Sequence, residues 1–187
     1  MAGVPRTSIE TERLRLEPMS GDHLDGLWAA ARSSLPELRA WMAWSLETSP
    51  ERMGAFVRDS EEAWAAGRAY RFAIVHDGEP VGVISVELHE RMSHRGEVGY
   101  WMRSDLAGRG LTTEAGHAVV GFAFGQLRLH RLDLSAGTGN PASQRVAEKL
   151  GFRREGLARN GSSGEGGFHD VYTYGLLETD PRGPGRR

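Results

Sequence analysis

The 187-residue sequence contains no cysteine, so it can form no disulfide, has no thiol nucleophile and needs no oxidising compartment. It also has no marked charge excess, with Lys+Arg 23 against Asp+Glu 25 and a net charge of -2. A broad basic surface for nucleic acid is therefore not expected. The N-terminus lacks the apolar core of a signal peptide, and no run is long enough to span a bilayer. We expect a soluble cytoplasmic protein with neither a nucleic-acid nor a membrane partner.

Several ligand-binding motifs are missing as well. The P-loop pattern G-x-x-x-x-G-K-[ST] is absent, and no third glycine completes the dinucleotide pattern G-x-G-x-x-G. The seven histidines are scattered without an H-x-x-x-H or H-E-x-x-H spacing, so the sequence predicts no metal site. A nucleotide-like ligand would therefore need a different phosphate loop.

The most informative stretch runs from Glu97 to Ala115. Alternating apolar residues predict a strand that ends near Met102, and a helical spacing begins at Leu111. Between them lies Gly108-Arg109-Gly110, where glycine lets the backbone approach a ligand closely. The unpaired N–H groups of the first helical turn favour an anion such as a pyrophosphate. A sharp turn also needs glycine without any ligand, so this pattern alone leaves both interpretations open.

The length predicts a single domain, which we place at residues 9–178, between a flexible segment at 1–8 and a disordered tail at 179–187. Strands are expected at residues 13–17, 69–76, 80–88, 97–102, 131–136, 152–157 and 171–177, and helices at 24–31, 35–44, 50–66, 111–123 and 141–150. The first strand ends at Pro18, which is typical of a sheet edge. Residues 91–96 are expected to form a polar turn, and the Gly- and Ser-rich residues 158–167 a mobile loop.

This order predicts a mixed α and β fold. Asp77-Gly78 is a strong hairpin signal, so the second to fourth strands should form an antiparallel meander. A helix then connects strands four and five, and such a crossover makes two neighbouring strands parallel.

Two motifs resemble those of the GNAT acetyltransferase superfamily. Residues 105–110 resemble its Q/R-x-x-G-x-G/A loop, and Asn140-Pro141-Ala142-Ser143, before a helix that ends in Gly151-Phe152, resembles its N-x-x-S signature. The stretch from Gly99 to Ala115 is similar to the RimL/RimJ-type branch, which acetylates protein N-termini. The resemblance extends from residue 14 to about 177. Asp105 departs from it, because the superfamily usually has Gln or Arg there; this weakens a side-chain contact and leaves the backbone cradle intact.

The resemblance implies a GNAT-like fold: a largely antiparallel mixed sheet, helices on both faces, and a splayed parallel pair, strands four and five, that admits the cofactor. It implies acetyl-CoA, or another short acyl-CoA, as acyl donor. The implied cofactor-binding residues are Tyr100, Trp101, Met102, Arg103, Gly108, Arg109, Gly110, Leu111, Thr112, Thr113, Asn140 and Ser143. The implied acceptor is a primary amine such as a protein N-terminus. A small-molecule amine, or a CoA-binding sensor without catalysis, stays open as an alternative, as does the choice between monomer and homodimer.

Acyl transfer to an amine needs an oxyanion site, a proton donor for the thiolate and a base. Backbone N–H groups around residues 100–102 are candidates for the first. Ser143 matches the family serine that reaches the CoA sulfur, although the same motif is also an ordinary helix start. The glutamate that RimL has after the last helix aligns with Ser162, so we consider Glu165 and Glu97 as alternative bases. For Glu97, a solvated strand-end carboxylate is the simpler interpretation.

Trp41 and Trp44 are candidates for the acceptor wall, because the RimL-type branch has a similar L-x-x-W-x-x-W segment; core packing is the competing interpretation. His169 and Asp170 begin the last strand, and a histidine is a reasonable proton acceptor there. A site without an evident strong base suits an α-amine better than a lysine side chain.

Overall fold

The computed structural model describes residues 4–89 and 93–181. These residues form one eight-stranded sheet in the order β1-β2-β3-β4-β5-β6-β8-β7. The strands are β1 (Ile9–Glu10), β2 (Arg15–Pro18), β3 (Ala69–His76), β4 (Glu79–Leu88), β5 (Arg95–Met102), β6 (Arg131–Gly137), β7 (Arg153–Gly164) and β8 (Gly167–Leu177). The helices are α1 (Leu24–Ser33), α2 (Leu35–Arg39), α3 (Pro50–Ala66), α4 (Leu111–Gly125) and α5 (Pro141–Lys149), with 3-10 turns η1 (Gly21–His23), η2 (Ala43–Glu47) and η3 (Ser104–Leu106).

Local sequence signals account for most of these boundaries. Ser49 caps α3 by accepting a hydrogen bond from the Arg52 amide at 3.3 Å, and Gly67, at φ 64°, ends the helix. Asp77 and Gly78 both have positive φ, as the tight turn between β3 and β4 requires. No helix in the described part of the chain is long and apolar enough to cross a membrane.

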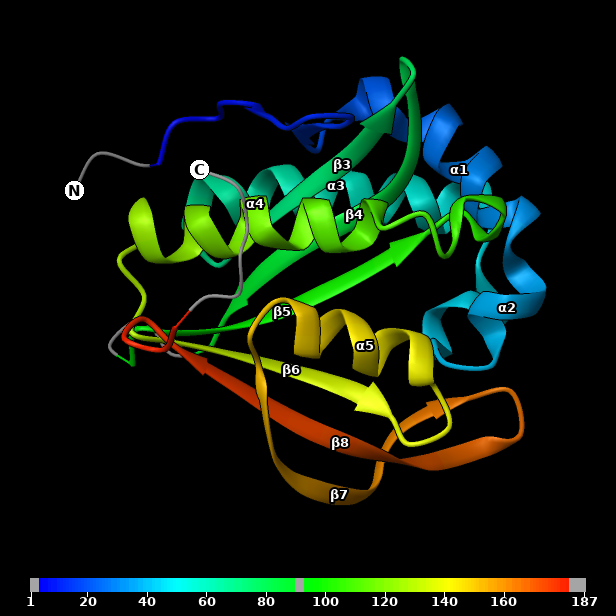
Figure 1. Cartoon of the computed structure of the whole chain (residues 1–187). Helices are drawn as coiled ribbons and strands as arrows, with labels where there is room; N and C mark the ends of the chain where they lie inside the picture. Colours follow the sequence, from blue (N-terminus) through cyan, green and yellow to red (C-terminus); the bar gives the residue numbers. More distant parts are fainter. Residues whose placement is uncertain (1–3, 90–92, 182–187) are drawn as a thin grey trace.

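The sheet confirms the mixed topology. All neighbouring strands are antiparallel except β5 and β6, which are parallel. These two are the fourth and fifth strands predicted from the sequence. These two pair only at three positions, from Arg95 opposite Arg131 to Glu97 opposite Asp133. Beyond Glu97 both strands continue without pairing to each other, so they splay apart as expected (Figure 1).

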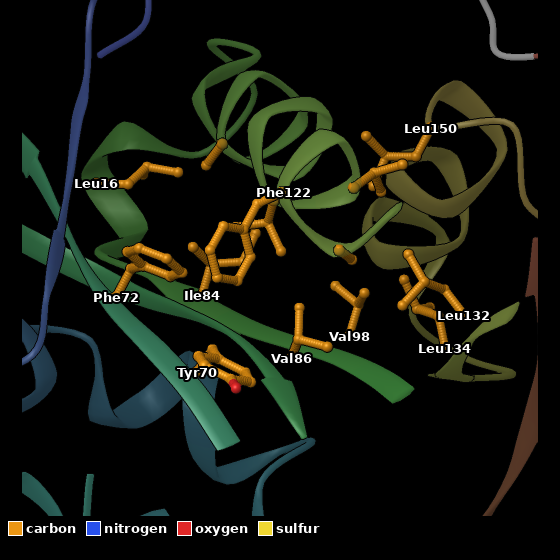
Figure 2. Packing of buried hydrophobic residues seen from close by; sticks show 14 of the residues in the cluster. Leu16, Tyr70, Phe72, Ile84, Val86, Val98, Phe122, Leu132, Leu134 and Leu150 are labelled. Carbon is orange, nitrogen blue, oxygen red and sulfur yellow. The ribbon is translucent and has the colours of Figure 1, made fainter. Parts of the chain in front are cut away.

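Helices cover both faces of the sheet, with α4 and α5 on one face and α1 and α3 on the other (Figure 1). The larger core lies beneath α4, where Phe122 packs among Phe72, Ile84 and Val86 from the central strands (Figure 2). Burial of such side chains stabilises each by about 1.5–3 kcal/mol. The result is a rigid platform beneath the glycine-containing loop that precedes α4.

The prediction that the first strand lies at the sheet edge was wrong. The two-residue strand β1 folds back and pairs outside β2. Glu114 on α4 holds the connecting turn, because its carboxylate accepts hydrogen bonds from the Thr11 hydroxyl at 2.7 Å and the Arg13 amide at 2.8 Å. This anchor lies 101 to 103 residues away in sequence, so the local pattern does not reveal it.

The predicted helix at residues 35–44 is broken. It ends at Arg39, Met42 adopts an extended conformation, and a 3-10 turn follows. The Arg39 carbonyl accepts a hydrogen bond from the Glu165 amide at 2.6 Å, which replaces the bond that a continuing helix would supply. Trp41 and Trp44 therefore do not share one helical face.

The predicted loop at residues 158–167 was also wrong, because β7 and β8 form a long hairpin there with a register irregularity between Ala158 and Ser162. Gly164 has a packing role rather than a flexible one, since a Cβ at this position would lie 2.5 Å from the Ala40 carbonyl oxygen. The expected turn at 91–96 lies partly, and the tail at 182–187 entirely, outside the described residues.

Candidate active site

Two cavities flank the C-terminal half of β5 on opposite sides of the sheet. We call the first the glycine-loop cavity; its volume is about 610 Å³. It is lined by Glu37, Leu38, Trp41, Met42, Tyr100, Trp101, Met102, Arg103, Ser104, Leu106, Ala107, Gly108, Gly110, Leu111, Thr112, Asn140, Ala142, Ser143, Arg145, Val146 and Lys149. Of the predicted cofactor-binding residues, all line it except Arg109 and Thr113.

The loop before α4 presents backbone rather than side chains to this cavity. Gly108 and Gly110 have φ of 78° and 81°, in the left-handed region that favours glycine, and nothing lies within 4 Å of a Cβ built on Gly108. Gly110 is the N-cap of α4 and provides no side-chain hydrogen bond. The N–H groups of the first turn, beginning at Leu111, therefore point towards the loop without a capping side chain. An anion is stabilised at such a helix end.

The cationic side chains around the loop fit a polyphosphate. Arg145 and Lys149 on α5 line the cavity, and neither forms an ion pair with any residue that the structure describes. Asp105, the departure from the family loop, does not line this cavity. Its carboxylate accepts hydrogen bonds from the Arg103 guanidinium at 2.7 and 3.2 Å, and these bonds lower its pKa. Asp105 therefore adds no unpaired negative charge to the cradle.

The splay of β5 and β6 orients two backbone N–H groups into the gap between them. The Arg103 amide donates to the Val81 carbonyl of β4, and Trp101 lies opposite Val83 in the same antiparallel ladder. Because bonding alternates along such a ladder, the amides of Tyr100 and Met102 point away from β4 and towards β6. β6 does not pair there.

Ser143 lies at the start of α5, where the Asn140 side chain caps the helix by accepting a hydrogen bond from the Ser143 amide at 3.1 Å. Its Oγ is 2.9 Å from the Tyr100 hydroxyl, and either oxygen can be the donor. Burial raises the pKa of Tyr100 to about 12, so its phenol stays protonated at neutral pH. Sequence reasoning selected the Tyr100 backbone and missed this hydroxyl.

We call the second cavity, on the α3 face of the sheet, the tryptophan cavity; its volume is about 550 Å³. It is lined by Met42, Trp44, Thr48, Arg52, Met53, Ala55, Phe56, Arg71, Val83, Ser85, Glu87, Gly99, Tyr100 and Trp101. Met42, Tyr100 and Trp101 line both cavities, so the two meet at the splayed end of β5.

The remaining predicted site residues lie elsewhere. Trp44 lines the tryptophan cavity, whereas Trp41 lines the glycine-loop cavity and packs edge-on against His169 at 5.7 Å between ring centroids. Asp170 accepts a hydrogen bond from the Asn160 amide at 2.9 Å within the β7–β8 hairpin, and Glu165 lies at its turn. Neither of these carboxylates lines the two cavities.

Glu97 does not line either cavity, but it lies two residues before Gly99 on the same face of β5. It forms no ion pair with a described residue. The described residues contain no cluster of three or more His, Asp or Glu side chains suited to a metal ion.

Comparison with known proteins establishes the family. Residues 13–153 match the family described as "Acetyltransferase (GNAT) domain". The chain therefore belongs to the GNAT acetyltransferases, and its fold is the GNAT fold. It is an N-acetyltransferase whose acyl donor is acetyl-CoA, which favours the enzyme over a sensor without catalysis.

Individual relatives carry the same activity in their names. The chain is 34% identical to the "Putative ribosomal N-acetyltransferase YdaF" of Bacillus subtilis, over 59% of this chain and 60% of YdaF. It is 26% identical to the ribosomal-protein-serine acetyltransferase of Escherichia coli, over 89% of this chain and 94% of that protein. A solved structure of RimL, the ribosomal L7/L12 α-N-protein acetyltransferase, in complex with coenzyme A superposes with a TM-score of 0.84 at 22% identity. This match covers 93% of this chain and 97% of RimL.

Proposed function

We propose that this enzyme transfers the acetyl group to the α-amino group of a protein or peptide N-terminus. The observation that carries the proposal is the junction of the two cavities at Tyr100 and Trp101, where a donor on one side of the sheet can meet an amine arriving from the other. The RimL-like resemblance and the names of the ribosomal-protein acetyltransferases point to the same class of acceptor.

The pKa of the acceptor amine supports this choice. An α-amine has a pKa of ~7.7–8.0 and a lysine side chain one of ~10.4, so presenting the neutral lysine at pH 7 costs about 3.5 kcal/mol more. Glu87 is the only carboxylate among the described residues that line the tryptophan cavity, and it is held by Arg71 at 2.7 Å. The cavity therefore offers no unpaired carboxylate that could deprotonate a lysine ammonium group, and this favours the α-amine as acceptor.

The glycine-loop cavity is the proposed donor site. The pyrophosphate of acetyl-CoA would lie on the amides that follow Gly108 and Gly110, and Arg145 and Lys149 would supply positive charge. Arg109 is exposed beside this loop and Thr113 belongs to the same helical turn, so we keep both as secondary contacts.

In the transfer step the amine nitrogen forms a bond to the thioester carbonyl carbon, the carbon–sulfur bond breaks, the nitrogen gives up one proton to a base, and the sulfur receives one. The Tyr100 and Met102 amides face the gap and would stabilise the negative charge that develops on the carbonyl oxygen. Ser143 would give its proton to the departing sulfur and take one from the Tyr100 phenol at 2.9 Å, and solvent would return a proton to Tyr100 at the end of the cycle. General acid help of this kind typically contributes ~10²–10⁴-fold.

For the base we retain Glu97. Three residues of a strand span about 10 Å, so bridging water would be needed to connect its carboxylate with an amine placed at the junction of the two cavities beside Tyr100. Glu165 is the weaker candidate, because it lies at the β7–β8 turn with its amide bound to Arg39, whereas Glu97 belongs to β5, whose following residues line both cavities. His169 and Asp170 would act only in positioning the hairpin beside Trp41.

A competition assay tests the acceptor. An N-terminal peptide and its α-blocked, lysine-bearing analogue are mixed in equal amounts with acetyl-CoA and the products are resolved by mass spectrometry. We expect the unblocked peptide to be acetylated preferentially, whereas preferential acetylation of the blocked analogue refutes the α-amine. A small-molecule amine of similar pKa is the second candidate, and it is favoured if neither peptide reacts while such amines do.

A further inference from the structure

The walls of the tryptophan cavity are aromatic and apolar. Trp44 and Trp101 lie with ring centroids 5.7 Å apart, and Phe56 and Met53 of α3 also line the cavity. Trp44 is 39% exposed although it is a large apolar side chain. An exposed tryptophan within a concave surface marks a place where a ligand can bury additional apolar area.

The floor of this cavity is left open by Gly99. A Cβ built on Gly99 would meet only the Ser85 hydroxyl, at 3.4 Å, so any other residue would project a side chain into the cavity beside Tyr100. Ser85 is 8% exposed, and its hydroxyl forms no hydrogen bond with any described residue. Because it lines the cavity, this hydroxyl can donate to or accept from a polar group on a ligand.

The charged side chains that line the cavity already form ion pairs within the protein. The Arg71 guanidinium donates to both oxygens of Glu87, at 2.7 and 3.0 Å, and also contacts Asp59 and the Phe56 ring. Arg52 pairs with Glu47 at 2.9 Å. A second ammonium group, as in a polyamine, would find no unpaired carboxylate among the residues that line the cavity, and a carboxylate would have to compete with Glu87 for Arg71.

We propose that the tryptophan cavity is a specificity pocket for a bulky, uncharged side chain on the first residue of the acceptor, with an aromatic residue bound best. This inference rests on the proposed function, because the α-amine must enter from this face. A volume of about 550 Å³ is far larger than an Ala or Ser side chain requires and lies within the usual range of small-molecule pockets. Tyrosine at this position can also reach a hydroxyl partner such as Ser85.

The test is a series of peptides that differ only at residue one, with Ser, Ala, Leu, Phe and Tyr at that position. For the wild-type enzyme we expect kcat/KM for the Phe and Tyr peptides to exceed that for the Ser and Ala peptides by at least ~10-fold, since a well-filled apolar pocket discriminates by ~10–200-fold per small apolar group. Spermidine should be a poorer acceptor than the Phe and Tyr peptides.

Two variants connect this preference to the cavity. Gly99→Leu, which fills the floor, should lower the ratio of Phe-peptide to Ser-peptide kcat/KM at least ~10-fold. Trp44→Ala removes one wall from a different element and should lower the same ratio at least ~5-fold. Gly121→Leu is the matched control, because Gly121 is exposed on α4 with nothing within 4 Å of its Cβ, and it should leave the ratio unchanged.

The outcomes separate the two proposals. If the peptides are acetylated but Ser or Ala at residue one is preferred, the pocket is refuted and the α-amine acceptor stands. The pocket is equally refuted if both variants fold, as judged by circular dichroism, and keep the wild-type ratio. If no peptide is acetylated while spermidine or another small amine is, the proposed function itself fails.

Discussion

Replacing Tyr100 by phenylalanine removes the hydroxyl that lies 2.9 Å from Ser143 Oγ and keeps the ring between the two cavities. If the two hydroxyls pass one proton to the departing thiolate, Tyr100→Phe and Ser143→Ala should each lower kcat by ~10²–10⁴-fold. This corresponds to about 2.7–5.4 kcal/mol of transition-state stabilisation. The double variant should lose no more than the worse single variant, since residues that act as a unit are not additive.

Steady-state kinetics with acetyl-CoA and an N-terminal peptide measure this cycle. The KM for acetyl-CoA should change much less than kcat in each variant, because the phosphate contacts are untouched. Tyr172→Phe serves as the control: it also removes a phenol, and its hydroxyl forms no hydrogen bond among the described residues. Its kcat should remain within about 2-fold of wild type.

Two results would refute the relay. A Ser143→Ala enzyme with near-normal kcat would reduce Ser143 to a helix-start residue. Losses that multiply in the double variant would mean that the hydroxyls act separately, and the hydrogen bond between them would then be structural.

Further expectations concern the donor site and the N-terminal segment. Gly110→Val places a branched side chain at φ 81° in the phosphate path and should weaken CoA binding severely by calorimetry; unchanged affinity contradicts the cradle. Lys149→Ala should raise the Kd for CoA, and the effect should shrink at high salt, whereas a salt-independent change would indicate lost packing. For Glu114, burial opposes ionisation, but hydrogen bonds from Thr11 and Arg13 outweigh it and lower the pKa. Glu114→Gln should therefore destabilise the fold by about 1–2 kcal/mol at pH 6, and the difference should fade as the pH drops through the lowered pKa; a difference that does not decrease as the pH is lowered contradicts this assignment.

Local signals made much of the fold predictable. The Asp77-Gly78 turn, the Ser49 cap and the Gly108 loop each depend on residues within a few positions of one another, where backbone sterics leave few alternatives. The two GNAT motifs then identified the family. The errors arose where distant segments decide the local structure: β1 is held by Glu114, and α2 is ended by the Glu165 amide.

The glycines of β7 illustrate a second kind of error. Composition suggested a mobile loop at 158–167, but Gly164 permits close backbone approach to α2, and the strand pairs with β8 on both sides of an irregularity. Composition cannot distinguish a glycine that confers flexibility from one that permits contact, because both lack a side chain.

The candidate site divides in the same way. Sequence motifs predicted that the backbone of β5, the glycine-containing loop and Ser143 belong to the site. They did not predict the Tyr100–Ser143 hydrogen bond, which spans 43 positions, or the Arg71–Glu87 pair, which joins two strands. Such contacts depend on strand register and helix placement. The roles of Ser143, Glu97 and the tryptophans stay predictions.

The central claim is that donor and acceptor meet through the gap between β5 and β6, each in its own cavity. A bisubstrate analogue that links CoA through an acetyl spacer to the α-nitrogen of a Phe-initiated peptide tests it directly. A crystal structure of the complex should show the pyrophosphate at Gly108 and Gly110 and the peptide side chain beside Trp44. Density with the peptide on the α5 side, or with the CoA moiety in the tryptophan cavity, would contradict the account.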